Sequence, residues 1–185
     1  MGEGPQKVVL NLGCGINKLP QALNVDAYGE PDVKWDLNQT PWPFEDNRFV
    51  HIQAYHVFEH LRNWWGAFEE CSRVLAPYGT MELRMPHESS QTALCYRDHL
   101  NVFSPISFHG IEGSGCGNNA WAKEVKNSLP IKMIDTKLVP FNSYQWMMRW
   151  CPWLLSFCAT HLRNFIWEQR YYFQSTKPIG GIDGR

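Results

Sequence analysis

The sequence lacks the features of a membrane-spanning, secreted or nucleic-acid-binding protein. No run approaches the roughly 20 apolar residues of a transmembrane helix, and residues 1–7 lack the basic start and apolar run of a secretory signal. The 17 Lys and Arg and the 18 Asp and Glu leave a net charge of −1, so no overall charge draws the protein toward nucleic acid or an anionic membrane. These absences predict a cytoplasmic protein with no membrane span and no nucleic-acid partner.

The cysteines also lack a pattern. The six cysteines include no Cys-x-x-Cys pair and no regular spacing; they are Cys14, Cys71, Cys95, Cys116, Cys151 and Cys158. This usage is typical of reduced thiols and argues against a zinc cluster or a disulfide framework. With 185 residues, 44% of them hydrophobic, the chain is predicted to form a single domain over residues 1–185.

The chain begins its regular structure with a strand that leads into a glycine turn. Residues 8–12 are apolar and partly β-branched, as in a strand buried on both faces, and Gly13 and Gly15 follow directly. Glycine lets a ligand approach the main chain closely. A pair of glycines also occurs in ordinary tight turns, so the turn alone does not establish a binding site.

A second apolar segment, residues 23–25, ends at Asp26. An acidic residue at this place in a nucleotide-binding unit can accept hydrogen bonds from both ribose hydroxyls. Asp26 stands only 11 positions after Gly15, whereas a dinucleotide fingerprint expects about 20. We therefore expect a trimmed first half, with no full-length helix between residues 16 and 23.

The remaining pattern predicts an open α/β sheet. Strand patterns follow at 33–35, 49–55, 80–85, 131–139 and 170–175, with an amphipathic helix at 64–75. The last two strands are expected to form an antiparallel edge pair. Residues 110–117 are glycine-rich and predict a mobile loop, and residues 180–185 predict a frayed tail.

An aromatic segment, residues 141–167, precedes the last strand. Its aromatic and aliphatic residues recur at three- and four-residue steps, which predicts a helical insert that Pro152 breaks or kinks. Such an insert can simply pack on the sheet. It can also form an apolar wall for a substrate or a face for a protein partner.

Taken together, the motifs resemble the class I S-adenosylmethionine-dependent methyltransferases, in particular the small methyltransferase type 11 group. The resemblance covers residues 8–108 in the right order; its pieces are 10–15 (LNLGCG), 24–26 (NVD), 36–37 (DL), 43–49 (PFEDNRF), 56–61 (HVFEHL), 73–79 (RVLAPYG) and 86–87 (PH). It implies a Rossmann-like seven-stranded sheet of order 3-2-1-4-5-7-6. It also implies a cofactor-binding core at 8–108 and a C-terminal part at 109–179.

The resemblance implies S-adenosyl-L-methionine as the cofactor and assigns its contacts. Gly13, Cys14 and Gly15 would face the methionyl part, Asp26 the ribose, Asp36 and Leu37 the adenine, and Tyr55 and His56 the sulfonium. Asn11 stands where the group usually has Asp, so it keeps a polar contact to the methionyl ammonium without the charge. Asn17 stands where a third glycine is usual.

The predicted reaction moves a methyl group to an oxygen or nitrogen of a small molecule, sugar or lipid-linked acceptor. A base is needed where the acceptor is a hydroxyl or a protonated amine. His56, His87 and His99 follow predicted strands on the ligand side and are candidates for that base, since histidine titrates near neutral pH.

Two other functions remain open at this point. His56-x-x-Glu59-His60 matches a zinc-hydrolase pattern, for which Glu69 or Glu70 could supply a third ligand, although the main interpretation assigns no metal. Alternatively, the protein binds the cofactor without catalysis, or serves as a partner subunit that uses the aromatic insert.

Overall fold

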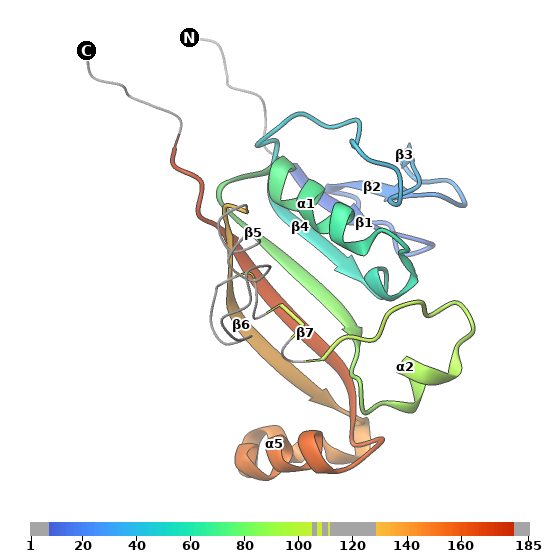
Figure 1. The fold of residues 1–185 in the computed structure, drawn as a ribbon, viewed down its shortest axis with the longest axis vertical. Helices are drawn as coiled ribbons and strands as arrows, with labels where there is room; N and C mark the ends of the chain where they lie inside the picture. Colours follow the sequence, from blue (N-terminus) through green and yellow to red (C-terminus); the bar gives the residue numbers. More distant parts are fainter. Residues whose placement is uncertain (1–7, 105–106, 109–110, 112–128, 180–185) are drawn as a thin grey trace, which may run out of the picture.

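Seven strands form one sheet in the order β3-β2-β1-β4-β5-β7-β6 (Figure 1). The computed structural model describes residues 8–104, 107–108, 111 and 129–179. The order confirms the predicted Rossmann-like methyltransferase sheet. Apart from Ile111, the predicted loop at 110–117 lies outside the described residues, as does the predicted tail at 180–185.

The first five strands run parallel. β1 (Val8–Leu12) lies between β2 (Ala22–Asp26) and β4 (Phe49–Tyr55), while β3 (Val33–Lys34) extends the sheet beyond β2 and β5 (Leu75–Pro86) extends it beyond β4. Because they are parallel, the carboxyl ends of β1, β2 and β4 meet at one edge, which is where ligands bind in open α/β sheets.

The other two strands form the predicted antiparallel pair. β7 (Ile166–Ser175) runs antiparallel to both β5 and β6 (Ile131–Pro140), which lies at the edge. β7 begins four residues earlier than its pattern predicts because Glu168 and Gln169 pair with both neighbouring strands. This extension places Glu168 beside the carboxyl end of β5, opposite Pro86.

The connections in the first half contain no helix. Residues 13–21, 27–32 and 35–48 form turns and loops, which confirms the trimmed first half. Side-chain hydrogen bonds hold the loop after β1 in place. The side chain of Asn24 accepts from the N–H of Leu19 and donates to its carbonyl, and Asn11 donates to the side chain of Asn24 at 2.9 Å. The short loop after β1 is therefore fixed by amides.

One face of the sheet carries the main hydrophobic core. α1 (Trp64–Val74) packs on this face, with its Phe68 ring 5.2 Å from Phe173 of β7 and 5.3 Å from Phe108. The opposite face is more polar: the Tyr55 hydroxyl donates to Glu82, and Arg84 also bonds Glu82.

The aromatic insert joins β6 to β7 and is helical, as predicted. It consists of η2 (Asn142–Tyr144), α4 (Trp146–Trp150) and α5 (Pro152–His161). Pro152 is the first residue of α5, where a missing N–H costs no helical bond. Figure 1 shows α5 at the lower end of the sheet, beside the end of β6 and the start of β7.

Within the described residues, no helix is long and apolar enough to cross a membrane. The five cysteines in this part of the chain are free thiols, and Cys116 lies outside it.

Candidate functional site

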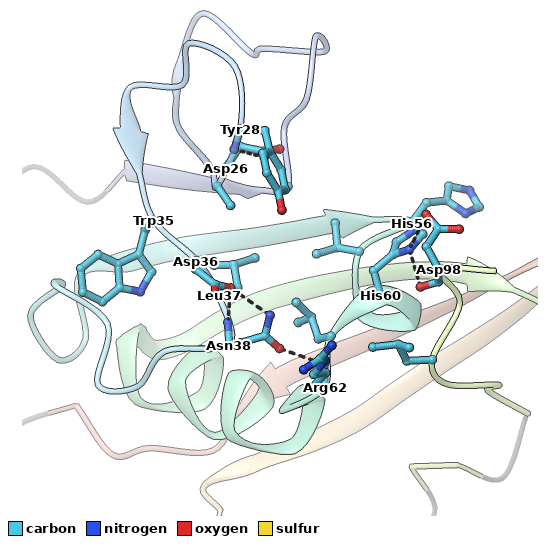
Figure 2. A pocket seen from close by; sticks show the side chains of 15 residues that line it. Asp26, Tyr28, Trp35, Asp36, Leu37, Asn38, His56, His60, Arg62 and Asp98 are labelled. Atoms are coloured by element: carbon cyan, nitrogen blue, oxygen red, sulfur yellow. Dashed lines mark hydrogen bonds and ion pairs between the residues drawn. The ribbon is translucent and has the colours of Figure 1, made fainter. Parts of the chain in front are cut away.

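A cavity of about 800 Å³ opens at the carboxyl ends of β1, β2 and β4 (Figure 2). Its volume lies within the range that ligand pockets in proteins occupy. Five of the predicted cofactor contacts line it: Gly13, Asp26, Asp36, Leu37 and His56. Figure 2 shows Asp26 and Tyr28 on one side of this cavity and His56, His60 and Asp98 on another.

The glycine turn lies at the base of this cavity. Gly13 has a φ of +58°, and a Cβ there would collide with the side chain of Val57, which also lines the cavity. Gly15 has a φ of +48°, but a Cβ there would meet no heavy atom within 4 Å. Glycine at position 13 is thus required both by backbone conformation and by space.

Asp26 links the glycine turn to the next loop. Its carboxylate accepts hydrogen bonds from the backbone N–H of Gly15 at 2.8 Å and of Tyr28 at 2.9 Å, one on each oxygen. A carboxylate oxygen can accept more than one bond, so both retain capacity for hydroxyl donors of a ligand.

The third strand leads into a turn built on Asp36. Its Oδ1 accepts from the backbone N–H and the side-chain amide of Asn38 at 3.0 and 2.9 Å. Asn38 in turn accepts from the N–H of Arg62 at 2.8 Å, which ties this turn to the start of α1. Asp36, Leu37 and Asn38 together form one wall of the cavity.

His56 follows β4 with a φ of +57°, a conformation that turns the chain out of the strand. Its Nε2 lies 3.0 Å from Glu168, and its Nδ1 lies 3.3 Å from Glu59. Burial lowers the pKa of His56, but these two carboxylates outweigh that effect and raise the pKa to about 9. The imidazole is therefore protonated at neutral pH and does not accept a proton there.

Four predicted cofactor contacts lie outside the cavity lining. Asn11 is buried, and its side chain is engaged with Asn24, the carbonyl of Asn17 and Gln53. Tyr55 points to the polar face of the sheet, where its hydroxyl bonds Glu82. Cys14 and Gly15 are not among the lining residues, but they directly follow Gly13, which is.

The structure separates the three candidate bases. Of these, only His56 lines the cavity. His87 is 1% exposed, and burial lowers its pKa to about 4. His99 lies with its ring centroid 4.8 Å from that of His60, which does line the cavity.

Several lining residues were not predicted from the sequence. They are Tyr28, Trp35, Asn38, Val57, His60, Leu61, Arg62, Asp98 and Leu100. Val57, His60 and Leu61 belong to the HVFEHL segment, and its place in the resemblance could have indicated that these residues line the site. Asp98 and Leu100 come from a stretch at 96–108 with no clear helix or strand pattern, which was expected near the active site without any role for these two residues.

Residues 14–83 match the methyltransferase domain family. Solved structures with a similar fold include an S-adenosylmethionine-dependent methyltransferase from Archaeoglobus fulgidus, with 12% identity, a TM-score of 0.58, and coverage of 91% of this chain and 86% of the other. The YcgJ protein from Bacillus subtilis shows 14% identity and a TM-score of 0.56, with coverage of 94% and 93%. The [4+2]-cyclase SpnF shows 13% identity and a TM-score of 0.56, with coverage of 94% and 76%. No curated protein matches the chain.

The chain therefore has the fold of these methyltransferase structures, and its residues 14–83 carry the sequence signature of the methyltransferase domain family. S-adenosyl-L-methionine is the cofactor that the sequence analysis predicts. The cavity suits such a ligand, since it offers a glycine turn for close approach, carboxylates for hydroxyl and amino groups, and apolar contacts from Val57 and Leu61.

The zinc-hydrolase alternative gains no support from the family match or the fold. Its nominated third ligands are engaged elsewhere on α1. Glu69 accepts from Trp65, and Glu70 bonds Arg73 and the N–H of Trp42.

Proposed function

We propose that this protein is a methyltransferase that moves the methyl group of S-adenosyl-L-methionine to an oxygen or nitrogen of a small molecule, sugar or lipid-linked acceptor. One observation carries the proposal. Gly13, Asp26, Asp36 and Leu37, predicted as cofactor contacts from three separate motifs, line a single cavity at the carboxyl edge of the sheet.

In this proposal the cofactor lies across β1, β2 and β4. The backbone of the turn at Gly13, Cys14 and Gly15 accommodates the methionyl part. Asp26 accepts from the ribose hydroxyls, and Oδ2 of Asp36 accepts from the adenine amino group. The geometry supports this order because Gly13, Asp26 and Asp36 all line the cavity and lie at the carboxyl ends of the neighbouring strands β1, β2 and β3.

The reacting methyl group would then lie toward His56. Transfer breaks the bond between carbon and sulfur and forms one to the acceptor, and positioning supplies most of the acceleration. Because its pKa of about 9 keeps His56 protonated, we assign it a fixed positive charge rather than the role of base. His99 does not line the cavity, but its ring packs against that of His60, which does. His87 is buried and is not among the lining residues.

Asn11 and Tyr55 have a supporting role in this proposal. Asn11 holds the turn by bonding Asn24 and the carbonyl of Asn17, so it shapes the methionyl site without needing to touch the ligand. Tyr55 precedes His56, and its bond to Glu82 anchors the end of β4.

We further propose that the aromatic insert at 141–167 contacts a protein partner. Trp150 and Trp153 are each 71% exposed, which is unusual for side chains of this size. One similar structure is a complex of the Haloferax volcanii Trm112 methyltransferase activator with a candidate methyltransferase, at 13% identity and a TM-score of 0.52. That precedent concerns a protein of the same fold, and the exposed tryptophans are the feature of this chain that supports the proposal.

Isothermal titration calorimetry with S-adenosyl-L-methionine tests the central claim. We expect 1:1 binding in the micromolar range, and no binding would refute the proposal. Mass spectrometry of metabolites from cells with and without the protein would then identify the acceptor by a gain of one methyl group. Cofactor binding without any methylated product would instead favour the non-catalytic alternative.

A further inference from the structure

We propose that Glu59, His60 and His99 form a binding site for a divalent transition-metal ion, with Zn²⁺ as the reference ion. One ligand atom from each of these residues lies within 4.8 Å of the others. Small side-chain rotations would bring three such atoms to about 2 Å from a common ion. Two imidazole nitrogens and one carboxylate oxygen suit zinc, iron and related divalent ions.

The carboxylate of Glu59 is the first observation that points to a bound cation. Glu59 is 1% exposed, and neither of its carboxylate oxygens accepts a hydrogen bond within the structure as described. The approach of His56 Nδ1 to 3.3 Å is an ion pair on one oxygen only. A carboxylate buried in this way needs further cationic partners, because burial removes the water that would otherwise solvate it.

One ring nitrogen of His60 has a hydrogen-bond acceptor, as the second nitrogen of a metal-binding histidine usually does. Its Nδ1 lies 3.1 Å from the backbone carbonyl of Asp98, which can only accept a hydrogen bond. In the neutral ring Nδ1 therefore carries the proton, and Nε2 keeps the lone pair that binds a metal. A carbonyl partner on the second ring nitrogen is the usual arrangement that fixes the tautomer of a metal ligand.

His99 completes the set although it lies far along the chain. Its Nδ1 is buried and has no hydrogen-bond partner in the structure as described. The backbone N–H groups of Leu100 and Asn101 both donate to the carbonyl of Glu59, at 2.7 and 3.1 Å. Main-chain bonds thus fix the loop that carries His99 against the segment that carries the other two ligands.

This set differs from the one that the sequence pattern His56-x-x-Glu59-His60 implies. His56 is held by Glu168, so the pattern contributes Glu59 and His60, and the loop contributes His99. Three protein ligands leave a coordination position open, as in catalytic rather than structural zinc sites.

The site borders the proposed cofactor cavity. His60 and Asp98 line that cavity, so an ion on His60 would face it. We infer that the open position takes an oxygen of the methyl acceptor, and this step rests on the proposed function. A metal-bound hydroxyl would lose its proton to solvent more readily. Its oxygen would then bond to the methyl carbon while the bond from that carbon to the cofactor sulfur breaks, which leaves S-adenosylhomocysteine.

The test uses the full-length protein after treatment with a chelator and gel filtration. We expect titration calorimetry with ZnCl₂ to show one ion per chain with micromolar or tighter affinity, and Zn²⁺ to raise the melting temperature. X-ray absorption at the zinc edge should show nitrogen and oxygen neighbours. His99→Ala and Glu59→Gln should each weaken binding at least tenfold, whereas His161→Ala, which removes an exposed histidine of α5, should not change it.

Three results would overturn the proposal: no Zn²⁺ binding by the unaltered chain, unchanged affinity in His99→Ala, or sulfur among the zinc neighbours. Thermal melting of each metal-free variant shows whether that variant is folded. Glu59→Gln changes a buried residue and can unfold the protein, whereas His99 is only partly buried, so His99→Ala still tests the site in that case. Binding of S-adenosyl-L-methionine to the metal-free protein is measured separately. Cofactor binding without zinc binding refutes the metal site alone. Zinc binding without cofactor binding refutes the proposed function and the acceptor step that rests on it, but leaves the metal site standing.

Discussion

The carboxylate of Glu168 on β7 lies 3.0 Å from Nε2 of His56 at the end of β4, although 112 positions separate the two residues in the chain. The same carboxylate accepts from Arg170 at 2.7 Å. Glu168 therefore connects the antiparallel end of the sheet to the wall of the cavity that His56 lines. Both cations help to keep the pKa of Glu168 below its usual value, against the opposing effect of burial.

Replacing Glu168 with Gln should destabilise the protein. The side chain of Glu168 is only 6% exposed, and removing its charge leaves the cations of His56 and Arg170 without their partner. Breaking a buried pair of this kind costs about 3–5 kcal/mol, which we reduce to roughly 2–3 kcal/mol because both cations are partly exposed. Urea unfolding measures the loss. Glu69→Gln, on the surface of α1, is the matched control and should change stability by less than about 0.5 kcal/mol.

Gly13→Ala should weaken binding of S-adenosyl-L-methionine much more than Gly15→Ala. Both substitutions place alanine at a positive φ, which costs about 1–2 kcal/mol in either case. Only at Gly13 does the new Cβ collide with Val57 on the cavity wall. We expect at least about a tenfold difference in dissociation constant between the variants, or 1.4 kcal/mol. Equal affinities by calorimetry would contradict a close approach of the cofactor to Gly13.

Asp26→Ala should reduce cofactor affinity by about 100-fold, since hydrogen bonds to a charged group contribute about 1.5–3 kcal/mol each. The residue also accepts from Gly15 and Tyr28, so circular dichroism must first show that the variant is folded. Asp135→Ala on β6, whose carboxylate pairs with Lys137 at the surface, should bind the cofactor as the unaltered chain does. Unchanged affinity in Asp26→Ala would remove Asp26 from the site.

His87 should make the protein less stable as the pH falls from 6.5 to 4.5. Burial lowers the pKa of His87 from 6.5 to about 4, so the unfolded chain binds a proton in this range and the folded chain does not. The contribution of neutral His87 to the free energy of unfolding is fully present above pH 6.5, and about 3 kcal/mol of it is lost as the pH approaches 4. His51, whose pKa burial also lowers, adds a loss of the same sign.

His56 does not obscure that measurement. Its pKa is raised, so its contribution is complete below pH 6.5 and is lost only as the pH rises toward 9. Urea unfolding at several pH values in His87→Asn, which keeps an acceptor for the N–H of Ser89, isolates the effect. The slope of stability against pH should become smaller in this variant, and an unchanged slope would show that His87 is not the main titrating group.

The local pattern of the chain was sufficient for most of the fold. The apolar run at 8–12 with its glycine turn, the short spacing to Asp26 and the helical period at 64–75 each reflect interactions between neighbours in sequence. The trimmed first half was predictable because 11 residues cannot hold a crossover helix. The break in the helical insert at Pro152 was predictable for a similar reason, since proline cannot continue a regular helix.

Side-chain direction was harder to predict. Tyr55 and His56 are adjacent and both were expected beside the sulfonium. Alternation along β4 instead sends Tyr55 to the polar face, and the positive φ of His56 turns the chain toward the cavity. Asn11 was expected to contact the cofactor, but its amide is engaged with Asn24 and Gln53 from neighbouring strands. The hydrogen-bond partner of a buried polar group often lies on a neighbouring strand, and the local sequence pattern does not show which strands are neighbours.

The sequence by itself determined the pattern of strands and the residues at the glycine turn, because these follow from periodicity and spacing over short distances, whereas the strand order and the cofactor were implied by the resemblance to a known family. Only the tertiary structure decided the charge of His56 and the neighbours of Glu59. Glu168 reaches His56 across the sheet, and His99 reaches Glu59 and His60 from a loop fixed by main-chain bonds. Protonation and metal binding depend on distances of a few ångströms between groups far apart in sequence, and folding alone sets those distances.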